Sequence, residues 1–242
     1  MTIISTGSRS INELLGGGIR TGLVTDIFGN SKYARNALSH SICINAARIF
    51  SDSIVIFVDT QGNFRPEIVL NYLVNTKEPS EILKRIVVVR LYSTRLFSTV
   101  IRKSILHRPQ LILIDNFISL FSSEFHGITK HLSVMHHLRE LAKAALDHDV
   151  ATVITNPSVY QKASQYPLQE STAFKRVAYG RNLLYEEEML GMTLSMHTST
   201  VLKLERSEVK DSVYSVQLVK PPRNSKCFIR IVKGQIYEFK QG

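Results

Sequence analysis

The sequence predicts an α/β domain with a mostly parallel sheet and helices on both faces of that sheet. As far as Thr155, short apolar runs alternate with stretches of helical periodicity, which is the pattern of βαβ units. Several of these runs are apolar without interruption, as is typical of strands covered on both faces. From Thr200 onward, three further β-type runs follow one another without helices. Antiparallel strands are therefore expected at the C-terminal end of the sheet.

The first part of the chain should form a short helix, a strand and a long helix. The helix is expected over Thr6–Leu15, with Ser8 or Ser10 as its N-cap and Gly16–Gly18 ending it. The apolar run Leu23–Phe28 predicts the first strand. The long helix that follows should reach about Phe50 and places these apolar residues on one face: Leu38, Ile42, Ala46 and Ile49.

The middle of the chain continues this alternation. Buried strands are expected at four runs: Ser53–Asp59, Arg85–Arg90, Leu111–Asp115 and Val150–Thr155. Helices are expected between them: Pro66–Leu73, Leu96–Leu106 and Ile128–Leu146. The last of these helices carries an apolar stripe: Leu132, Met135, Leu138, Ala142 and Ala145. The final strands are expected at Val201–Leu204, Val213–Val219 and Cys227–Val232.

Length and composition indicate one soluble domain. A chain of 242 residues suits a single α/β core, so residues 1–242 are expected to form one domain. No apolar run approaches the ~20 residues needed to span a bilayer, and the N-terminus has no export signal. Cys43 and Cys227 have no metal-ligand spacing, so both are interpreted as reduced thiols of a cytoplasmic protein.

The charge balance points toward a polyanionic partner. The chain has 30 Lys and Arg residues against 20 Asp and Glu residues, with a net charge of +10. Nucleic acid is the first partner to consider, because neutralising phosphates releases counterions. General solubility explains the same excess equally well.

The turn after the first strand carries the main candidate site. A P-loop reads G-x-x-x-x-G-K-[ST] and cradles phosphates at a helix N-terminus. This chain has a glycine followed by four residues in the same place, but the last three positions differ. The candidate nucleotide-binding residues are Gly29, Asn30, Ser31, Lys32, Tyr33, Ala34, Arg35 and Asn36.

Two strand ends add candidates to this site. Asp115 ends an apolar strand, where P-loop proteins place the carboxylate that holds Mg²⁺ or its water shell; a helix or turn cap is the alternative. Gln61 follows the strand ending at Asp59, where a base would orient an attacking water, and a glutamine cannot act as a general base. The stretch around Gln61 could equally be a simple turn into the helix that starts at Pro66.

The segment from Ser158 to Gly191 is too long for an ordinary connection between two elements, and it is predicted to form a functional loop. Aromatic residues alternate there with cations, and such a pattern can stack on bases and follow phosphates. The candidate DNA-binding cations of this loop are Lys162, Lys175, Arg176 and Arg181. Packing against itself or a partner protein is the alternative, since Glu186–Glu188 would repel phosphate.

The histidines between His126 and His148 do not form a metal motif. His131, His136 and His137 do not share a face at i, i+4 spacing, and no H-E-x-x-H is present. Solvated histidines on a helix are the better interpretation, and no metal site is expected beyond Asp115 if Mg²⁺ is retained.

Four stretches resemble recombinases of the RecA superfamily, of the RadA type. Thr6–Gly22 is similar to their entry segment, and Val58–Glu67 is similar to their second signature. Leu111–Asp115 resembles their Walker B strand, and Val153–Asn156 resembles the strand before their second DNA loop. These matches run in order over nearly the whole chain. The resemblance implies a RecA-like P-loop fold, and without an N-terminal helical DNA-binding domain the chain is most similar to the short archaeal RadB-like proteins.

The departures from the family pattern concern its catalytic positions. The P-loop lysine is replaced by Arg35 and the metal-binding hydroxyl by Asn36. Gln61 stands at the catalytic glutamate, and Pro157 stands at the glutamine that senses the γ-phosphate. Because a planar guanidinium does not fit where an ammonium lies between phosphates, binding of ATP and Mg²⁺ is doubtful. Together these losses indicate that hydrolysis is not the function.

The resemblance implies a RadA paralog that assists homologous recombination and DNA repair in the cytoplasm, at the nucleoid. Its partners would be single- or double-stranded DNA and a RadA-type recombinase or another paralog. His126 and Lys130, where the family has its first DNA loop, join the candidate DNA contacts. The alternatives are a weak DNA-dependent ATPase that uses Arg35, and a regulatory scaffold of RecA fold that does not bind DNA.

Overall fold

The computed structural model describes residues 1–49, 54–74, 79–158, 191–207, 211–223 and 225–239. Within these ranges, nine strands form one sheet in the order β11-β10-β9-β8-β3-β7-β6-β4-β5. Its strands are β3 (Val24–Gly29), β4 (Val55–Asp59), β5 (Ile86–Arg90), β6 (Leu111–Asp115), β7 (Ala151–Pro157), β8 (Thr200–Arg206), β9 (Val213–Lys220), β10 (Lys226–Val232) and β11 (Gln235–Glu238). A separate antiparallel pair joins β1 (Ile3–Ile4) to β2 (Ile19–Arg20).

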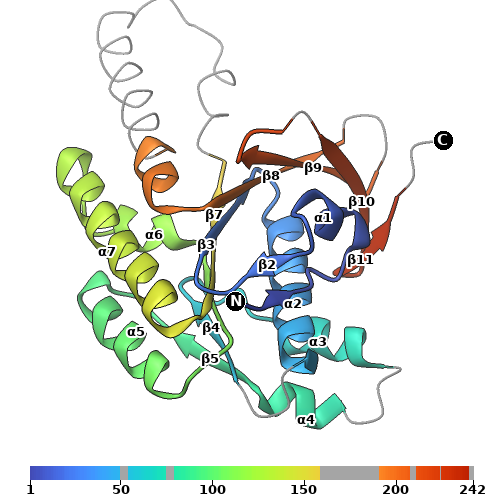
Figure 1. Cartoon of the computed structure of the whole chain (residues 1–242), viewed down its shortest axis with the longest axis horizontal. Helices are drawn as coiled ribbons and strands as arrows, with labels where there is room; N and C mark the ends of the chain where they lie inside the picture. Colours follow the sequence, from blue (N-terminus) through green and yellow to red (C-terminus); the bar gives the residue numbers. More distant parts are fainter. Residues whose placement is uncertain (50–53, 75–78, 159–190, 208–210, 224, 240–242) are drawn as a thin grey trace, which may run out of the picture.

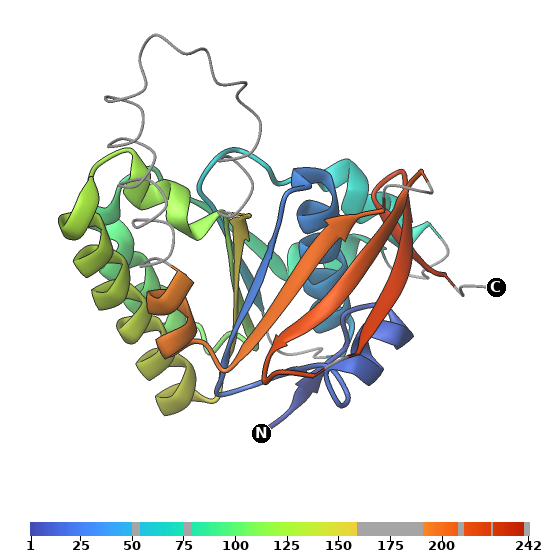
Figure 2. The same cartoon turned by 90° about the horizontal axis from the view of Figure 1, so that it is seen from above.

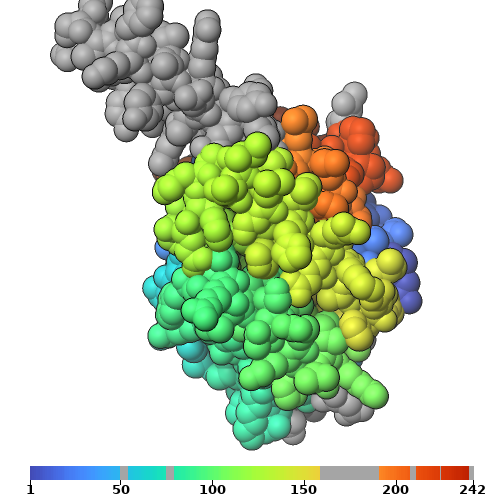
Figure 3. All heavy atoms as spheres, turned by 90° about the vertical axis from the view of Figure 1, so that its left-hand side faces the viewer, coloured from blue at the N-terminus to red at the C-terminus, as the bar shows by residue number. Residues whose placement is uncertain are grey.

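Helices cover both faces of the sheet (Figures 1 and 2). The first face carries α1 (Arg9–Leu14), α2 (Lys32–Ile49), α3 (Pro66–Leu73) and α4 (Pro79–Lys84). The second face carries α5 (Phe97–Leu106), α6 (Phe117–Ser122), α7 (Gly127–His148) and a helix over residues 191–197. In Figure 3, α5 and α7 form one continuous surface over this second face. The predicted α/β architecture is confirmed.

The sheet is parallel from β8 to β5 and antiparallel beyond β8. β3 lies near its middle and pairs in parallel with both β7 and β8. β9, β10 and β11 then continue as antiparallel neighbours, as the sequence predicts. Two details differ from the expectation. β8 is parallel to β3 although it starts the C-terminal group, and the short hairpin strand β11 was not predicted.

The N-terminus of α1 is tied to the C-terminal strand β11. Ser8 is the N-cap of α1, and its side chain accepts a hydrogen bond from the Ile11 N–H. The carboxylate of Glu238 on β11 accepts from the Ser8 hydroxyl at 2.8 Å and from the Arg9 N–H at 2.6 Å. Negative charge at a helix N-terminus is stabilising, so Glu238 completes the cap that Ser8 begins.

Two sequence predictions about burial are wrong. β5 was expected to be a buried strand, yet Val87 is 39% exposed and Val88 is 37% exposed. It is the edge strand of the sheet and pairs only with β4 among the described strands, so its apolar run is covered on one side only. The stripe on α7 is also displaced. Leu132 is 51% exposed, and the buried residues are Val134, Leu138, Leu141 and Ala145.

The histidines of α7 are less solvated than expected. His137 packs edge-on against Phe97 with ring centroids 5.0 Å apart, and against Phe121 at 5.2 Å. His131 forms a hydrogen bond with the hydroxyl of Thr193, which links α7 to the helix over residues 191–197. His136 is exposed. These contacts give two of the histidines a packing role.

Candidate functional site

The carboxyl ends of the central parallel strands bring the predicted site residues together. Asp59 at the end of β4 lies beside Asp115 at the end of β6 in the sheet register. Gly29 at the end of β3 lies beside Pro157 at the end of β7. In open α/β sheets, ligands bind outside the carboxyl ends of the strands. The predicted site residues therefore lie at the edge of the sheet where ligands bind in this class of fold.

The loop expected over Gly29–Asn36 is much shorter than predicted. β3 continues through Gly29 and α2 begins at Lys32, so only Asn30 and Ser31 separate the strand from the helix. Ser31 caps α2: its hydroxyl accepts from the Ala34 N–H at 3.2 Å, and its carbonyl accepts from the Arg35 N–H at 3.1 Å. Two N–H groups of the first helical turn thus have acceptors within the chain.

Packing against β8 explains why position 29 is a glycine, without any role in phosphate binding. It pairs with Leu204 of β8, and a Cβ atom built on Gly29 would lie 2.1 Å from the Leu204 carbonyl oxygen. Its own carbonyl accepts from the Ser158 N–H at 2.9 Å. The close approach of β8 to the end of β3 therefore requires a residue without a side chain here.

Arg35 turns its side chain inward, beneath the end of β3. The residue is only 5% exposed, and its guanidinium Nη1 donates to the carbonyl of Gly29. Burial lowers the pKa of Arg35, while the charges of Asp115 and Asp26 raise it. An arginine remains protonated at neutral pH despite such burial. The positive charge beneath the strand–helix turn is thus supplied by the Arg35 side chain itself.

Asp115 is held by neighbouring side chains. It is 2% exposed; its Oδ2 accepts from Asn63 Nδ2 at 2.6 Å, and its Oδ1 accepts from the Thr155 hydroxyl at 2.7 Å. The described residues contain no group of three His, Cys, Asp or Glu side chains arranged to hold a metal ion. With Asn36 in place of a hydroxyl and Arg35 under the turn, the residues present do not fit a Mg²⁺-nucleotide site.

Asp59 shapes the turn that contains Gln61. Its carboxylate accepts from the backbone N–H groups of Gln61 at 3.2 Å, Asn63 at 2.9 Å and Phe64 at 3.1 Å. The residue at position 61 is exposed, so this loop presents Gln61 to solvent at the carboxyl edge of the sheet. These contacts agree with the alternative interpretation, in which the stretch around Gln61 is a structural turn before α3.

His40 supports the same turn from α2. The backbone N–H of Arg65 donates to His40 Nε2 at 3.1 Å, so Nδ1 carries the proton and donates to the Asn36 carbonyl at 2.6 Å. Its ring stacks on Phe64 with centroids 5.2 Å apart. Burial lowers the pKa of His40, so the neutral ring is the form that the fold stabilises.

Asp26 is a buried carboxyl that sequence reasoning did not single out. It lies inside β3 and is 3% exposed, and its Oδ1 accepts from Asn156 Nδ2 at 2.9 Å. Asn156 in turn accepts from the Ile118 N–H at 2.9 Å and so connects β3 to the start of α6. The signal available in the sequence was a single charged residue within a mostly apolar strand.

Asp26 makes the stability of the protein depend on pH. Burial raises the pKa of Asp26 from 3.8 to about 7, against the opposing effects of Asn156 and Arg35. Between these values the folded state binds more protons than the unfolded state. The stabilising contribution is therefore complete below about pH 4 and is lost as the pH rises through 7. The shift corresponds to a free energy on the order of 4 kcal/mol.

Replacing Asp26 with asparagine should remove this dependence. We expect Asp26→Asn to match the wild type near pH 4 and to be more stable by a few kcal/mol at pH 8, because no buried charge then forms. Urea unfolding of both proteins at each pH measures the difference, in which the contribution of His40 cancels. Asp211→Asn is the control, since the Asp211 side chain is 94% exposed. A difference that is constant with pH would contradict the assignment.

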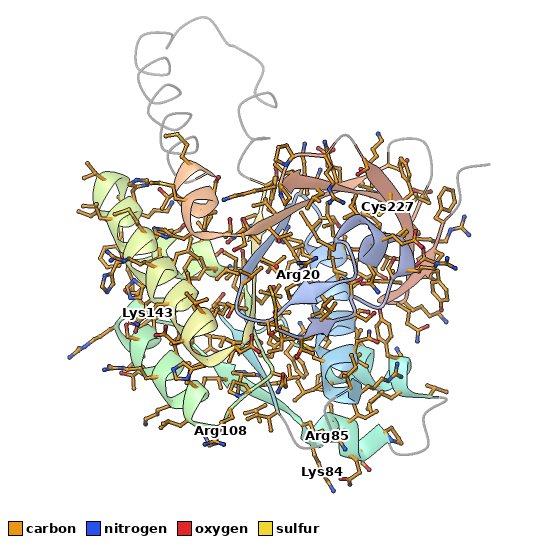
Figure 4. All side chains as sticks on the ribbon, in the orientation of Figure 1. Arg20, Lys84, Arg85, Arg108, Lys143 and Cys227 are labelled. Atoms are coloured by element: carbon orange, nitrogen blue, oxygen red, sulfur yellow. The ribbon has the colours of Figure 1, made fainter. Side chains whose placement is uncertain are left out.

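The structure describes only part of the predicted DNA interface. His126 precedes α7 as its N-cap residue, and Lys130 lies in the first turn of that helix, so the two belong to one helix end. Lys162, Lys175, Arg176 and Arg181 lie outside the described residues. Among the other cations, Arg20 on β2 and Arg108 after α5 lie on separate parts of the molecule (Figure 4). Arg102, Arg139 and Lys143 line one pocket between α5 and α7.

Two further expectations concern the thiols and the membrane. Cys43 and Cys227 are both free; Cys43 is buried in the core, where burial raises the pKa of its thiol, and Cys227 is half-buried. None of the described helices is both long and apolar enough to cross a membrane.

Comparison with known proteins places these features in context. The sequence profile of the Rad51 family matches residues 1–182. The chain is 30% identical over 169 residues to the DNA repair protein Rad51 homolog of Drosophila melanogaster, covering 63% of this chain and 49% of that protein. It is 29% identical over 167 residues to the DNA repair and recombination protein RadA of Cenarchaeum symbiosum (strain A), covering 64% and 42%. It is 28% identical over 171 residues to the DNA repair protein RAD51 homolog 1 of Arabidopsis thaliana, covering 65% and 50%. The chain thus matches about half of the length of these relatives, or less.

Proposed function

The chain belongs to the Rad51 family, and from this premise we propose that it assists homologous recombination and DNA repair without hydrolysing ATP. Its sheet and helices agree with the RecA-like fold that the resemblance implies. The relatives named above carry repair and recombination in their names. In the proposed role, the chain binds DNA and a recombinase of the RadA type as a paralog similar to the RadB proteins.

The observation that carries the non-catalytic part of the proposal is the position of Arg35. The guanidinium lies under the strand–helix turn on the Gly29 carbonyl, where phosphate chemistry would need open space. Gln61 and Pro157 stand where the family resemblance implies a catalytic glutamate and a γ-phosphate sensor. Loss of one positioned group typically costs about 10²–10⁴-fold in rate. Several such losses at one site support a role that does not depend on hydrolysis.

The DNA-binding part of the proposal is supported by charge. The net charge of +10 favours phosphate neutralisation, and the first turn of α7 holds Lys130 beside His126. The cations of the loop from residue 158 to 191 would add phosphate contacts. DNA affinity should therefore fall steeply as the salt concentration rises.

An ATPase assay tests the catalytic part. We expect hydrolysis at the background rate, with or without DNA, and no change in that rate for Asp115→Asn. A millimolar concentration of Mg²⁺-ATP should leave the melting temperature unchanged, because a ligand stabilises a fold only if it binds the folded state. A DNA-stimulated rate that Asp115→Asn abolishes would establish the weak ATPase instead and overturn the proposal.

A pull-down from the native host tests the partner. Recovery of a RadA-type recombinase with and without nuclease treatment would support direct binding to the recombinase. Recovery only without nuclease would limit the role to binding the same DNA. Fluorescence anisotropy with single- and double-stranded oligonucleotides at low salt tests DNA affinity separately; no binding at low salt would favour the regulatory scaffold.

A further inference from the structure

A cavity lies on the second face of the sheet, away from α2. It measures about 910 Å³ and opens between β3, β8, β9 and the helix over residues 191–197. Asp26 and Asn156 line it, together with Phe28, Met192 and Val201. In Figures 1 and 2, the helix over residues 191–197 lies at the border of the described helical cover of this face, and the sheet continues beyond it to β11.

Asp26 gives this cavity a buried polar group. The residue is 3% exposed, yet it contributes to the lining of the cavity. Its carboxylate accepts hydrogen bonds from the Asn156 side chain and from the backbone of Ile27, and Asp26 forms no ion pair with any described residue. A carboxylate has about four lone-pair sites, so acceptor capacity remains for a donor that enters the cavity. The positive charge of Arg35 acts on Asp26 from the carboxyl edge of the sheet, but its guanidinium donates to the Gly29 carbonyl.

The remaining lining sets the size and shape of a ligand. The cavity lies within the roughly 300–1,000 Å³ range of small-molecule sites, which are mostly apolar with a few convergent polar groups. Phe28, Met192 and Val201 supply the apolar walls. Such walls suit a flat, weakly polar ring system with hydrogen-bond donors along one edge. An aromatic heterocycle with an amino group has this chemistry.

The rim carries a cation that can be released. Lys203 Nζ pairs with Glu205 at 2.6 Å, and the two side chains are 31% and 40% exposed. Ion pairs with this exposure contribute little, so Lys203 can exchange its partner for a phosphate. Lys220, also on the rim, is held differently, since it donates to the Thr198 carbonyl at 2.7 Å and fixes the end of the 191–197 helix.

We propose that this cavity binds one nucleotide unit whose base carries an exocyclic amino group, with the amino edge on Asp26 and the phosphate at Lys203. Adenine, cytosine and guanine carry such a group and thymine does not. The unit can come from a free nucleotide or from an unstacked base of single-stranded DNA. The second source rests on the proposed DNA-binding function, and the first does not.

The test compares oligothymidylate with the same oligonucleotide carrying one central adenine. At pH 8, where Asp26 is mostly ionised, the wild type should bind the adenine-containing strand about tenfold more tightly, the difference expected for one hydrogen bond to a charged group. Asp26→Asn, which keeps the shape of the side chain, should reduce the preference to less than about twofold. Aminopurine in place of the adenine should brighten on binding as it leaves the base stack.

Filling the cavity provides a second variant with a matched control. Val219 lines the rim and is 41% exposed, so Val219→Phe should fold and should abolish both the adenine preference and the aminopurine signal. Val232 on β10 is also 41% exposed but does not line the cavity, so Val232→Phe should behave as the wild type. Equal behaviour of the two variants would overturn the proposal.

Free nucleotides separate this proposal from the proposed function. Deoxyadenosine monophosphate should shift amide or methyl NMR signals around the cavity in the wild type and not in Val219→Phe, and thymidine monophosphate should not. Binding of the free nucleotide without any oligonucleotide binding would support the cavity and overturn the DNA-binding function. Oligonucleotide binding without adenine preference, and without a response to deoxyadenosine monophosphate, would overturn the cavity assignment and leave the function intact.

Discussion

Replacing Gly29 with alanine is expected to destabilise the fold by about 3 kcal/mol or more, at or beyond the upper end of typical overpacking costs. The new Cβ atom would lie 2.1 Å from the Leu204 carbonyl oxygen, a backbone atom that cannot rotate away as a side chain can. Moving it would require breaking the pairing between β3 and β8. Urea unfolding measures the loss, and a reduced yield of folded protein would accompany it.

Gly62→Ala separates this clash from the ordinary cost of losing a glycine. Gly62 has φ +71°, and nothing lies within 4 Å of a Cβ built there. Its substitution costs only the strain of the left-handed conformation, about 1–2 kcal/mol. If Gly29→Ala proved no more damaging than Gly62→Ala, the close approach of β8 would not be the reason for glycine at position 29.

The glycine at position 29 shows how a correct pattern can predict the wrong local structure. Its spacing to Ala34–Asn36 suggested a loop of P-loop length, whereas the chain enters α2 at Lys32. The second glycine of a P-loop, which keeps such a segment out of the helix, is Ala34 here, the best helix former. Ser31 then caps the helix early. The sequence placed the candidate residues at neighbouring strand ends, as the register shows, whereas the helix start depended on one replaced glycine.

The sequence predicted correctly which strands are buried only where burial follows from the residues of the strand itself. β4 and β6 are continuously apolar and buried along their whole length, as expected. β5 has the same kind of apolar run but lies at the edge of the sheet. Its position follows from strand order, which arises from contacts distant in sequence. Asp26 was missed for a related reason, because its burial depends on β7, β8 and the 191–197 helix meeting around it.

Arg35 should be the most important charged side chain for stability. We expect Arg35→Met, which keeps a long unbranched side chain, to destabilise the protein by about 3–5 kcal/mol, the cost of leaving buried charges without their partner. The variant removes the donor to the Gly29 carbonyl and the positive charge near Asp115 and Asp26. Urea unfolding at pH 8, where Asp26 is mostly ionised, measures the loss. Arg9→Met is the control, because the Arg9 ion pair with Glu13 is exposed and should contribute little to stability.

A double-mutant cycle identifies which carboxylate Arg35 serves. If the Arg35 charge compensates Asp26, Asp26→Asn should stabilise the Arg35→Met background at pH 8 by more than it stabilises the wild type, and this excess should shrink at pH 5. The part of the loss that remains belongs to Asp115 and to the Gly29 carbonyl. If Arg35→Met proved as stable as Arg9→Met, the buried Arg35 guanidinium would not contribute to the stability of the fold. The space under the turn would then be open to a phosphate, and the argument against ATP binding would lose its main support.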